Sequence, residues 1–334
     1  MEKGHSIIIL KTDVRDMERR LATIDIGTNT ALLFVAGWKD GAMQDLHGAS
    51  GFVRLGEGVD ASRRVGPAAL GRLRSVLEHH MKEMAPWNVE ELIVTGTSAS
   101  RDAANADDIR AIVREVTGSE LRILSGEEEA RTTFEGAMAG LEGFDTLWDS
   151  LHPETRLTVI DVGGGSTEFV QGVKRYAAPE FACSLDMGSV RMMERHFNVQ
   201  PPSAAEVASA SNDFTAMMDV ALVGAQKSEV CVGASGTAVI LSLVHHGRDS
   251  MQDMPGGSHL TRDDLEMWSE RLLAMTREDV LALIPRHGRG REDVFPAGVQ
   301  ILRLAMEKLG AHMLFVSPYG VRQGVAIRHF RRSG

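Results

Sequence analysis

Short apolar runs alternate with longer amphipathic segments along the first half of the chain. The run Leu21–Ile26 predicts a buried strand, and Gly27–Thr30 predicts a turn into a second strand at Ala31–Ala36. A hairpin turn at Lys39–Gly41 then leads into a third extended segment. Pro67 begins a helix, because proline suits the first helical position. The apolar residues of that helix share one face: Leu70, Leu73, Leu77, Met81 and Met84.

The rest of the first half continues the alternation of strands and helices. Strands are predicted at Glu91–Thr95 and Leu121–Leu124, with a helix over Arg101–Thr117 between them. Another helix begins after Ser125. This succession of elements is typical of an α/β domain.

The second half repeats the scheme 136 residues later. Leu157–Val162 predicts a buried strand, Gly163–Ser166 a turn, and Thr167–Gln171 a returning strand. Ser203 and Glu206 have the spacing of a capping box at the start of a helix. Helices are expected at 189–198, at 204–225, after 237, after 261 and from about 320, and strands at 229–232 and 313–316. The segment 294–309 is apolar-periodic. The repeat indicates two α/β domains that face each other across a ligand cleft.

Composition agrees with this division and limits the function. A chain of 334 residues corresponds to about two domains at roughly 150 residues each. The formal net charge of −10 argues against a nucleic-acid binder, because such proteins gather cations on one surface. Two cysteines, Cys183 and Cys231, cannot build a disulfide framework and fit a reducing compartment. No apolar run approaches the roughly 20 residues that span a bilayer, so we expect a cytoplasmic protein without membrane contact.

Asp25–Thr30 is the first candidate site. Gly27 permits a tight turn in which backbone N–H groups approach an anion, and Thr28 and Asn29 add short polar side chains. Asp25, at the end of the strand, can hold Mg²⁺ directly or through water. Taken alone, the segment is better explained as a simple hairpin turn, since the same residue types are common in turns.

Asp161–Glu168 is the matching segment in the second half. Three consecutive glycines, 163 to 165, weaken the end of a strand, and close approach of the backbone to a phosphate explains their presence. A flexible hairpin is the alternative explanation. Two such hairpins, one in each predicted domain, are harder to explain as turns alone. The pair suggests two phosphate-binding loops that close on one anion.

Ser125–Arg131 is a third candidate, with three adjacent acids. Ser125 and Glu128 fit a capping box, and acids suit a helix N-terminus. This account explains Glu127 and Glu128 well, and the residues alone favour it. A glutamate at this position near the domain junction can also act as a general base on water. Arg101 can fork onto a phosphate, although a solvated arginine at a helix start explains it equally well.

Together these motifs resemble the Ppx/GppA group of exopolyphosphatases and guanosine pentaphosphate phosphohydrolases. They stand in the family's order and cover about residues 21–330. The combination is specific, because the kinases and chaperones of the superfamily that contains the Ppx/GppA group, the actin, sugar-kinase and heat-shock-chaperone superfamily, do not have the Ser-Gly-Glu-Glu-Glu-Ala run between the two loops. The matching segments are 24–30, 96–105, 124–131, 159–168, 187–191, 233–237 and 294–298.

The resemblance implies a fold and a division into domains. The fold is that of the actin, sugar-kinase and heat-shock-chaperone superfamily: two ribonuclease-H-like α/β domains with an interdomain cleft. We expect residues 1–20 to be a poorly ordered leader, 21–128 with about 318–334 to form domain I, and 129–317 to form domain II. Longer members carry a further C-terminal helical region, so this chain resembles a short two-domain form.

The resemblance also implies roles for single residues. Glu129 matches the catalytic glutamate that orients or deprotonates the attacking water, and Asp161 belongs to the same catalytic site. The implied Mg²⁺ ligands are Asp25, Asp161 and Glu168. The implied phosphate-binding residues are Gly27, Thr28, Asn29, Arg101, Gly163, Gly164, Gly165 and Ser166.

The implied reaction is Mg²⁺-dependent hydrolysis of a terminal phosphoanhydride. The expected substrate is inorganic polyphosphate, or pppGpp, which would lose its terminal phosphate to become ppGpp. A homodimer is expected as the assembly. Two alternatives stay open: an ATP-dependent kinase or ATPase of the same superfamily, and a non-catalytic sensor of polyphosphate or an alarmone. The intact set of Glu129, Asp25 and Asp161 speaks against the sensor.

Overall fold

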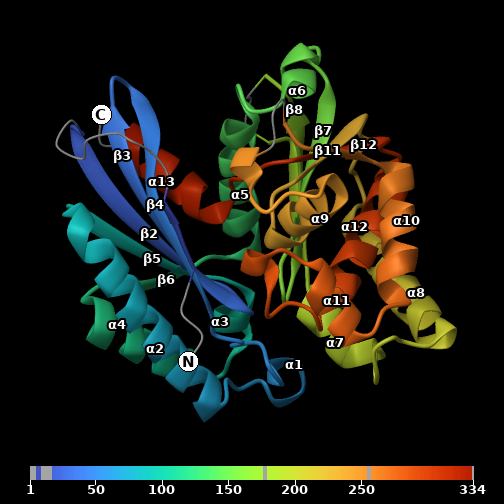
Figure 1. Ribbon diagram of the computed structural model, residues 1–334, viewed down its shortest axis with the longest axis horizontal. Coiled ribbons are helices and arrows are strands. Elements are labelled where there is room, and N and C mark those ends of the chain that lie inside the picture. The colour runs from blue at the N-terminus through green and yellow to red at the C-terminus, as the bar shows by residue number, and fades with distance from the viewer. Residues whose placement is uncertain (1–4, 9–16, 176–178, 254–256, 333–334) are drawn as a thin grey trace. The chain divides into compact units, whose positions relative to one another are not determined.

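The structure is a computed structural model that describes residues 5–8, 17–175, 179–253 and 257–332. The chain divides into two compact units: unit 1 contains residues 1–125 and 321–334, and unit 2 contains residues 126–320. Each unit is a mixed β-sheet with helices packed on it, so the predicted α/β fold class is confirmed (Figure 1). The interdomain cleft stays a prediction.

Unit 1 is built around an antiparallel meander of long strands. Its described elements are β1 (His5–Ile8), β2 (Arg19–Ile26), β3 (Thr30–Lys39), β4 (Ala42–Phe52), α1 (Val59–Ser62), α2 (Pro67–Met84), η2 (Ala85–Trp87), β5 (Glu91–Gly96), α3 (Ser98–Asp102), α4 (Ala106–Thr117), β6 (Leu121–Ile123) and α13 (Val321–Arg332). The strand order is β1-β4-β3-β2-β5-β6, with β5 parallel to β2 and β6 parallel to β5. Asp40 and Gly41, both with positive φ, make the predicted turn between β3 and β4.

Two hydrophobic clusters hold unit 1 together, one on each face of the sheet. Alternate residues of β2 point to opposite faces, so Ile24 packs with α2 and α4 whereas Leu21 packs with α13. The apolar face predicted for α2 lies in the first cluster. It is made of Leu73, Leu77 and Met84, which are buried, and of Leu70 and Met81, which are partly buried.

The prediction of one continuous helix over Arg101–Thr117 is wrong, because the structure has two helices there. α3 ends at Asp102 and α4 begins at Ala106. The break lies at Asn105, whose side chain bonds the backbone of Val65: it accepts from the N–H at 2.9 Å and donates to the carbonyl at 3.1 Å. A tertiary contact thus overrides the local helical pattern.

The expectation that residues 1–20 lie outside the fold is wrong for two parts of that segment. His5–Ile8 forms β1, which pairs antiparallel with β4, and β2 begins at Arg19. The buried side chain of Met17 fills the space beside Gly37, where a Cβ atom would lie 2.4 Å from its sulfur. The sheet edge of β4 pairs with β1 over residues 47–50, as an exposed strand edge readily does with a further strand. The rest of the segment up to residue 16 lies outside the described residues.

Unit 2 repeats the strand pattern of unit 1. Its described elements are α5 (Gly126–Leu141), α6 (Thr146–Ser150), β7 (Arg156–Val162), β8 (Thr167–Val173), β9 (Phe181–Leu185), α7 (Ser189–His196), α8 (Ala204–Ala221), β10 (Val230–Gly233), α9 (Gly236–His246), η3 (Met251–Asp253), β11 (His259–Thr261), α10 (Arg262–Leu273), α11 (Arg277–Leu283), η4 (Arg286–Gly288), α12 (Phe295–Leu309) and β12 (Met313–Val316).

The strand order of unit 2 is β11-β12-β10-β7-β8-β9. The antiparallel meander β7-β8-β9 corresponds to β2-β3-β4, and the parallel strands β10 and β12 correspond to β5 and β6. The duplication indicated by the sequence is therefore present in the topology.

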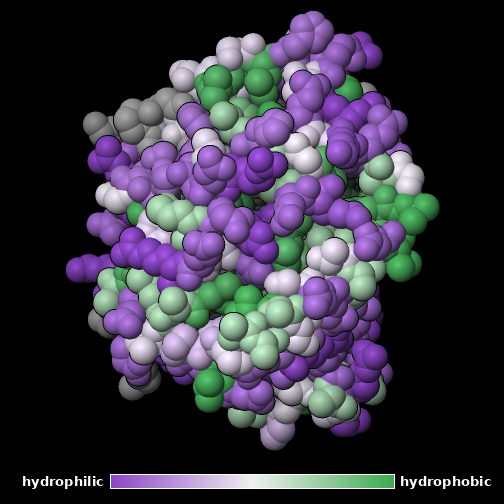
Figure 2. Space-filling model, turned by 90° about the vertical axis from the view of Figure 1, so that its right-hand side faces the viewer, coloured by the Kyte–Doolittle hydropathy of each residue, from purple (hydrophilic) through white to green (hydrophobic). Residues whose placement is uncertain are grey.

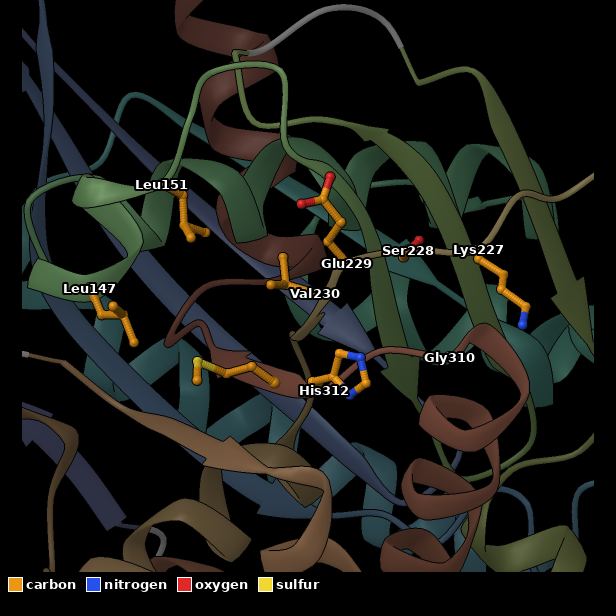
Figure 3. A pocket seen from close by; sticks show the side chains of 9 residues that line it. Leu147, Leu151, Lys227, Ser228, Glu229, Val230, Gly310 and His312 are labelled. Atoms are coloured by element: carbon orange, nitrogen blue, oxygen red, sulfur yellow. The ribbon is translucent and has the colours of Figure 1, made fainter.

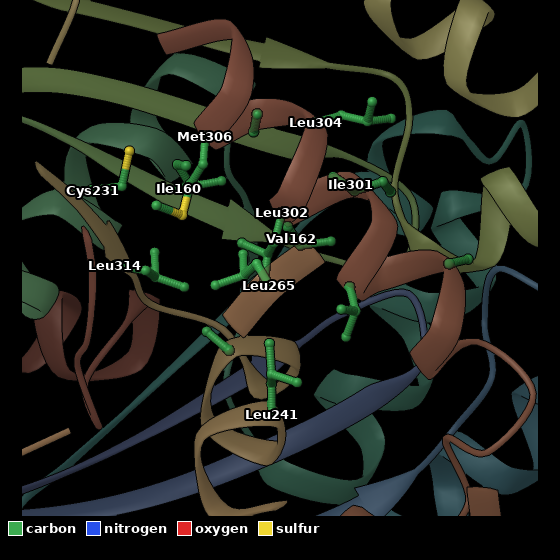
Figure 4. Close-up of a cluster of buried hydrophobic side chains, with 14 of the residues drawn as sticks. Ile160, Val162, Cys231, Leu241, Leu265, Ile301, Leu302, Leu304, Met306 and Leu314 are labelled. Carbon is green, nitrogen blue, oxygen red and sulfur yellow. The ribbon is translucent and has the colours of Figure 1, made fainter. Parts of the chain in front are cut away.

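The sheet of unit 2 has a different hydrophobic cluster on each face. Ile160 and Val162 of β7 pack with α12 and its neighbouring helices, where Figure 4 shows side chains from strands and helices meeting in one cluster. Val159 packs on the opposite face with α5. Because successive residues of a strand point to opposite faces, Asp161 lies on the α5 face with Val159.

Capping residues place several helices of unit 2 as predicted. Ser203 and Glu206 form a capping box at the start of α8, and Thr261 and Asp264 form one at the start of α10. α8 ends at Ala221, four residues earlier than expected. The sequence pattern gave no prediction for β9, α6, β11 or α11, which are short elements.

The view in Figure 2 shows mostly hydrophilic residues, with hydrophobic residues gathered in smaller patches. Val220 and Val223, near the end of α8, are about three-quarters exposed. Within the described residues, every helix is too short or too polar to cross a membrane.

Candidate active site

The loop between β2 and β3 in unit 1 is closed by its own backbone. The N–H of Gly27 donates to the carbonyl of Thr30 at 2.9 Å, which makes a tight four-residue turn. Residues after β4 fix the loop from outside: Val53 and Arg54 donate to the carbonyl of Asn29, and Gly56 donates to that of Thr28. The side chains of Thr28 and Asn29 are buried. The N–H groups of these two residues donate to no backbone carbonyl of the described chain.

Asp25 lies at the end of β2, directly before this loop. Its carboxylate accepts a hydrogen bond from the Thr95 hydroxyl at 3.2 Å. Thr95 is the partner of Asp25 on the neighbouring strand β5, and Leu32 is its partner on β3. Asp25 therefore has no acidic residue opposite it in the sheet.

Arg101 lies in the last turn of α3, not at the start of a helix as expected. Its guanidinium donates to the carbonyl of Leu124 at 2.9 Å, at the end of the segment that leads out of unit 1. The side chain is half-buried. This hydrogen bond fixes the orientation of the guanidinium, which is the kind of group that binds phosphate with two parallel hydrogen bonds.

The loop between β7 and β8 in unit 2 makes the same turn as the first loop. The N–H of Gly163 donates to the carbonyl of Ser166 at 3.0 Å. The N-terminus of α7 fixes this loop, because Ser189 donates to the carbonyl of Gly163 and Val190 donates to that of Gly164. The N–H groups of the three residues 164 to 166 donate to no backbone carbonyl of the described chain, so they are suited to bind an anion.

Close packing explains why glycines are needed here. A Cβ atom on Gly188 would lie 2.5 Å from the carbonyl carbon and oxygen of Gly164. A Cβ atom on Gly163 would lie 3.1 Å from the carbonyl oxygen of Ser166. Both contacts are with backbone, which cannot rotate away, so larger residues would displace the loop.

Asp161 and Glu168 face each other across this hairpin. They are direct partners of β7 and β8, so their side chains lie on the same face of the sheet. Asp161 accepts a hydrogen bond from the Thr133 hydroxyl at 3.2 Å, and Glu168 accepts one from the Ser184 hydroxyl at 2.7 Å. Glu168 is buried, whereas Asp161 keeps partial exposure.

The surroundings of Asp161 disfavour its charged form. Burial raises the pKa of its carboxyl group from 3.8 to about 6, although the hydrogen bond from Thr133 acts in the opposite direction. A carboxylate whose charge is poorly solvated is a favourable ligand for a cation, because the cation restores the lost solvation.

Glu129 lies in the first turn of α5, and its side chain is 6% exposed. α5 packs on β7, β8 and β9, on the face that carries Asp161 and Glu168 (Figure 1). Thr133, four residues later, is on the same side of the helix as Glu129 and bonds Asp161. The structure thus brings three of the predicted residues, Glu129, Asp161 and Glu168, to one face of unit 2.

Two polar residues of this face were not predicted from the sequence. Thr133 has the i+4 spacing from Glu129 and was open to prediction from helical periodicity. Ser184 lies on β9 opposite Glu168, and its pairing depends on a strand that the sequence pattern did not indicate. Both are hydroxyl donors to the acidic residues.

The residues of unit 2 fit a magnesium ion. Carboxylate oxygens are the ligands that Mg²⁺ prefers, and it often takes only one or two from the protein, with water and phosphate oxygens completing the shell. Asp161 and Glu168 can supply these two. Across the described residues, no three side chains of the types His, Cys, Asp and Glu form a metal-binding group.

The pocket drawn in Figure 3 lies away from these residues. It has a volume of about 550 Å³ and is lined by residues at the starts of β10 and β12, with Leu147 and Leu151 opposite. Parallel strands place the Gly163 loop at the other ends of β7 and β10. None of the predicted site residues lines this pocket.

Comparison with known proteins identifies the family. A sequence model described as "Ppx/GppA phosphatase family" matches residues 34–333. The chain belongs to the Ppx/GppA phosphatase family. Exopolyphosphatase 2 of Mycobacterium tuberculosis is 32% identical to it over 326 residues, which cover 92% of this chain and 98% of that protein. Exopolyphosphatase 1 of Mycobacterium bovis is 28% identical over 313 residues, 92% of this chain and 88% of that one.

Solved structures of the Ppx/GppA phosphatase family have the same fold. The crystal structure of an exopolyphosphatase-like protein matches this chain with a TM-score of 0.87 at 27% identity, covering 94% of this chain and 98% of that chain. The PPX-GPPA enzyme of Aquifex aeolicus matches with a TM-score of 0.73 at 26% identity, covering 93% and 99%. The predicted resemblance is confirmed, and the protein is an enzyme of a phosphatase family.

Proposed function

We propose that this enzyme hydrolyses the terminal phosphoanhydride bond of inorganic polyphosphate with the help of Mg²⁺. The observation that carries the proposal is the acidic face of unit 2, where Glu129 of α5 lies over the strands that carry Asp161 and Glu168. Relatives named exopolyphosphatases support polyphosphate as the substrate. The same chemistry would convert pppGpp to ppGpp, since that bond is also a terminal phosphoanhydride.

Each of the two glycine loops binds a phosphoryl group of the substrate in this proposal. Backbone N–H groups of Thr28 and Asn29 in the first loop, and of residues 164 to 166 in the second, donate to its oxygens. Arg101 adds a guanidinium to the phosphate chain. These donors spread the negative charge that the phosphoryl group carries in the transition state.

Glu129 acts on the attacking water. A carboxylate on the first turn of a packed helix has a fixed position, which is what a general base or a water-orienting residue needs. Its neighbour Glu127 is different, because it is exposed and forms an ion pair with Arg131 at 3.0 Å. Glu127 is therefore not expected to take part in the chemistry.

Asp161 and Glu168 of unit 2 would hold Mg²⁺, and Asp25 is the proposed metal ligand of unit 1. When bound, the ion neutralises charge on the phosphoryl group and its leaving oxygen. The carboxylates of Asp161 and Glu168 would hold the ion on the hairpin that carries the loop Gly163–Ser166.

The proposal is tested by replacing Glu129. Phosphate release is measured with short polyphosphate, long polyphosphate, pppGpp and ATP, each with and without Mg²⁺. Glu129→Gln keeps the shape but removes the base, and we expect kcat on polyphosphate to fall by about 10²- to 10⁴-fold. Glu127→Gln, two residues away on the same helix turn, is the matched control and is expected to stay within about twofold of the parent.

Near-normal turnover by a folded Glu129→Gln protein would remove Glu129 from the mechanism. Release from ATP alone, with formation of ADP, would favour the kinase or ATPase alternative. Binding of polyphosphate without any release in the presence of Mg²⁺ would favour the sensor.

Two further expectations accompany the proposal. The family resemblance implies a homodimer, which light scattering coupled to gel filtration tests by the mass of the particle in solution.

The cytoplasm is the expected location, since the two thiols, Cys183 and Cys231, are unpaired in the structure. Fractionation of cells that express the chain tests it.

A further inference from the structure

Two hydroxyl groups contact the acidic residues on the α5 face of unit 2. Thr133 is fully buried and donates to Oδ2 of Asp161 at 3.2 Å. Ser184, on the edge strand β9, donates to Oε1 of Glu168 at 2.7 Å. The two donors come from different elements, α5 and β9, and each meets one carboxylate of the pair.

A neutral hydroxyl suits this position for a physical reason. A carboxylate can rotate about the bond to its stem, and a donor on one oxygen fixes its orientation. A lysine or arginine in the same place would fix it too, but its positive charge would compete with a bound cation. A hydroxyl fixes the orientation and leaves the negative charge in place.

The same contacts place the helix that carries Glu129. A Cβ atom on Gly126 would lie 2.7 Å from Cβ of Ser184 and 3.1 Å from its hydroxyl, so the glycine lets the first turn of α5 lie directly on β9. Thr133 then joins the next turn of α5 to Asp161 on β7. Glu129 lies between these two attachment points, one turn before Thr133.

We propose that Thr133 and Ser184 are positioning residues, whose hydroxyls orient Asp161 and Glu168 toward a divalent cation and hold α5 so that Glu129 faces the same place. The inference rests on the proposed function for the catalytic role of Glu129. It extends that function by naming Thr133 and Ser184 as the residues that fix the positions of the acidic side chains.

The test compares three replacements on α5, with Mn²⁺ as the probe. Thr133→Val removes the hydroxyl and keeps the shape, Thr133→Ser restores the hydroxyl, and Thr132→Val is the matched control. Thr132 is also buried, but its hydroxyl donates to the Glu128 carbonyl of its own helix at 2.5 Å. The dissociation constant of Mn²⁺ is measured by electron paramagnetic resonance, and kcat and KM for polyphosphate are measured in Mg²⁺.

We expect Thr133→Val to weaken Mn²⁺ binding by about 10- to 100-fold and to lower kcat by a similar factor, with KM for polyphosphate changed less than about threefold. Thr133→Ser should recover most of both losses, and Thr132→Val should match the parent. A folded Thr133→Val protein that binds Mn²⁺ within twofold of the parent, with an unchanged kcat, would overturn the proposal.

Ser184→Ala keeps the proposal testable if Thr133→Val does not fold. It removes the second hydroxyl at a half-buried position, and we expect a loss of about 10-fold in Mn²⁺ affinity. Mn²⁺ binding by a folded Ser184→Ala protein within twofold of the parent would then overturn it. If the parent releases no phosphate from polyphosphate while Thr133→Val still loses Mn²⁺ affinity, the proposed function fails and the positioning role stands.

Discussion

The loops Gly27–Thr30 and Gly163–Ser166 make the same turn in the two units, yet their surroundings differ. In each, the N–H of the first residue donates to the carbonyl of the fourth. The first loop is held by the segment after β4, and the second is held by the N-terminus of α7. The duplicated hairpin thus keeps its backbone while its supports change.

The faces beside the two loops differ more than the loops themselves. Opposite Asp25 stands Leu32, whereas opposite Asp161 stands Glu168, at positions that correspond in the repeat. The helix on this face of unit 1 is α13, which begins Val-Arg-Gln, and its counterpart in unit 2 is α5, which begins Gly-Glu-Glu-Glu. One copy therefore has a single acid and a basic helix start, and the other has an acidic pair under an acidic helix start.

This difference suggests how a duplicated scaffold can divide a reaction. Unit 1 contains a closed loop of the kind that suits phosphate binding, and Arg101 belongs to the same unit. Unit 2 has, in addition, the carboxylates of Glu129, Asp161 and Glu168, for which we propose metal binding and water activation. We infer that the chemistry is concentrated in unit 2.

Exchanging the residues that differ between the two hairpins, Leu32 and Glu168, gives the largest expected effect on kcat. Glu168→Leu places the residue of unit 1 at the corresponding position of unit 2 and should lower kcat for polyphosphate by at least about 100-fold, because it removes a proposed metal ligand. Leu32→Glu makes the reverse change, and phosphate release should stay within about threefold of the parent. Equal losses from the two replacements, measured by phosphate release in Mg²⁺, would contradict the division between the units.

Alanine at the supporting glycines compares how firmly the two loops are held. A Cβ on Gly188 meets the backbone of Gly164, whereas one on Gly56 meets the end of the Thr28 side chain, which can rotate. We expect Gly188→Ala to cost about 1–3 kcal/mol of stability and about 10-fold in kcat, and Gly56→Ala to cost less of both. Gly71→Ala, on α2 with open space around it, is the control and should not reduce stability. Chemical denaturation and phosphate release check these values.

The pKa of Asp161 predicts a smaller, pH-dependent effect. Its folded pKa of about 6 lies above the ordinary 3.8, so the folded state favours the protonated form, and stability falls as pH rises from about 4 to 6. Without divalent ions, Asp161→Asn should therefore be more stable than the parent at pH 8, by roughly 1–3 kcal/mol, and equal to it below pH 4. Thermal unfolding in chelator at both pH values checks the prediction; the same stability difference at pH 8 and below pH 4 would contradict it.

Much of this site was predictable because its parts are local. The apolar run before each loop, the glycines and the repeat of 136 residues all lie in short segments, and the partnership of Asp161 with Glu168 follows from a four-residue turn in a hairpin. Glu129 was recognised through the family resemblance, since the residues alone favoured a helix cap.

The rest depends on contacts between distant segments. Asn105 ends a helix because of Val65, forty residues away, and no local pattern shows that bond. Ser184 faces Glu168 only because β9 pairs with β8 in one register. The edge strand β1 depends in the same way on β4.

The central claim is that unit 2 holds the divalent ion, and Mn²⁺ titration followed by electron paramagnetic resonance tests it most directly. The parent, Asp25→Asn and Asp161→Asn are compared at neutral pH without substrate. The account predicts that Asp161→Asn loses at least about 100-fold in Mn²⁺ affinity, whereas Asp25→Asn loses less than about 10-fold. A loss for Asp25→Asn equal to or larger than that for Asp161→Asn would contradict it.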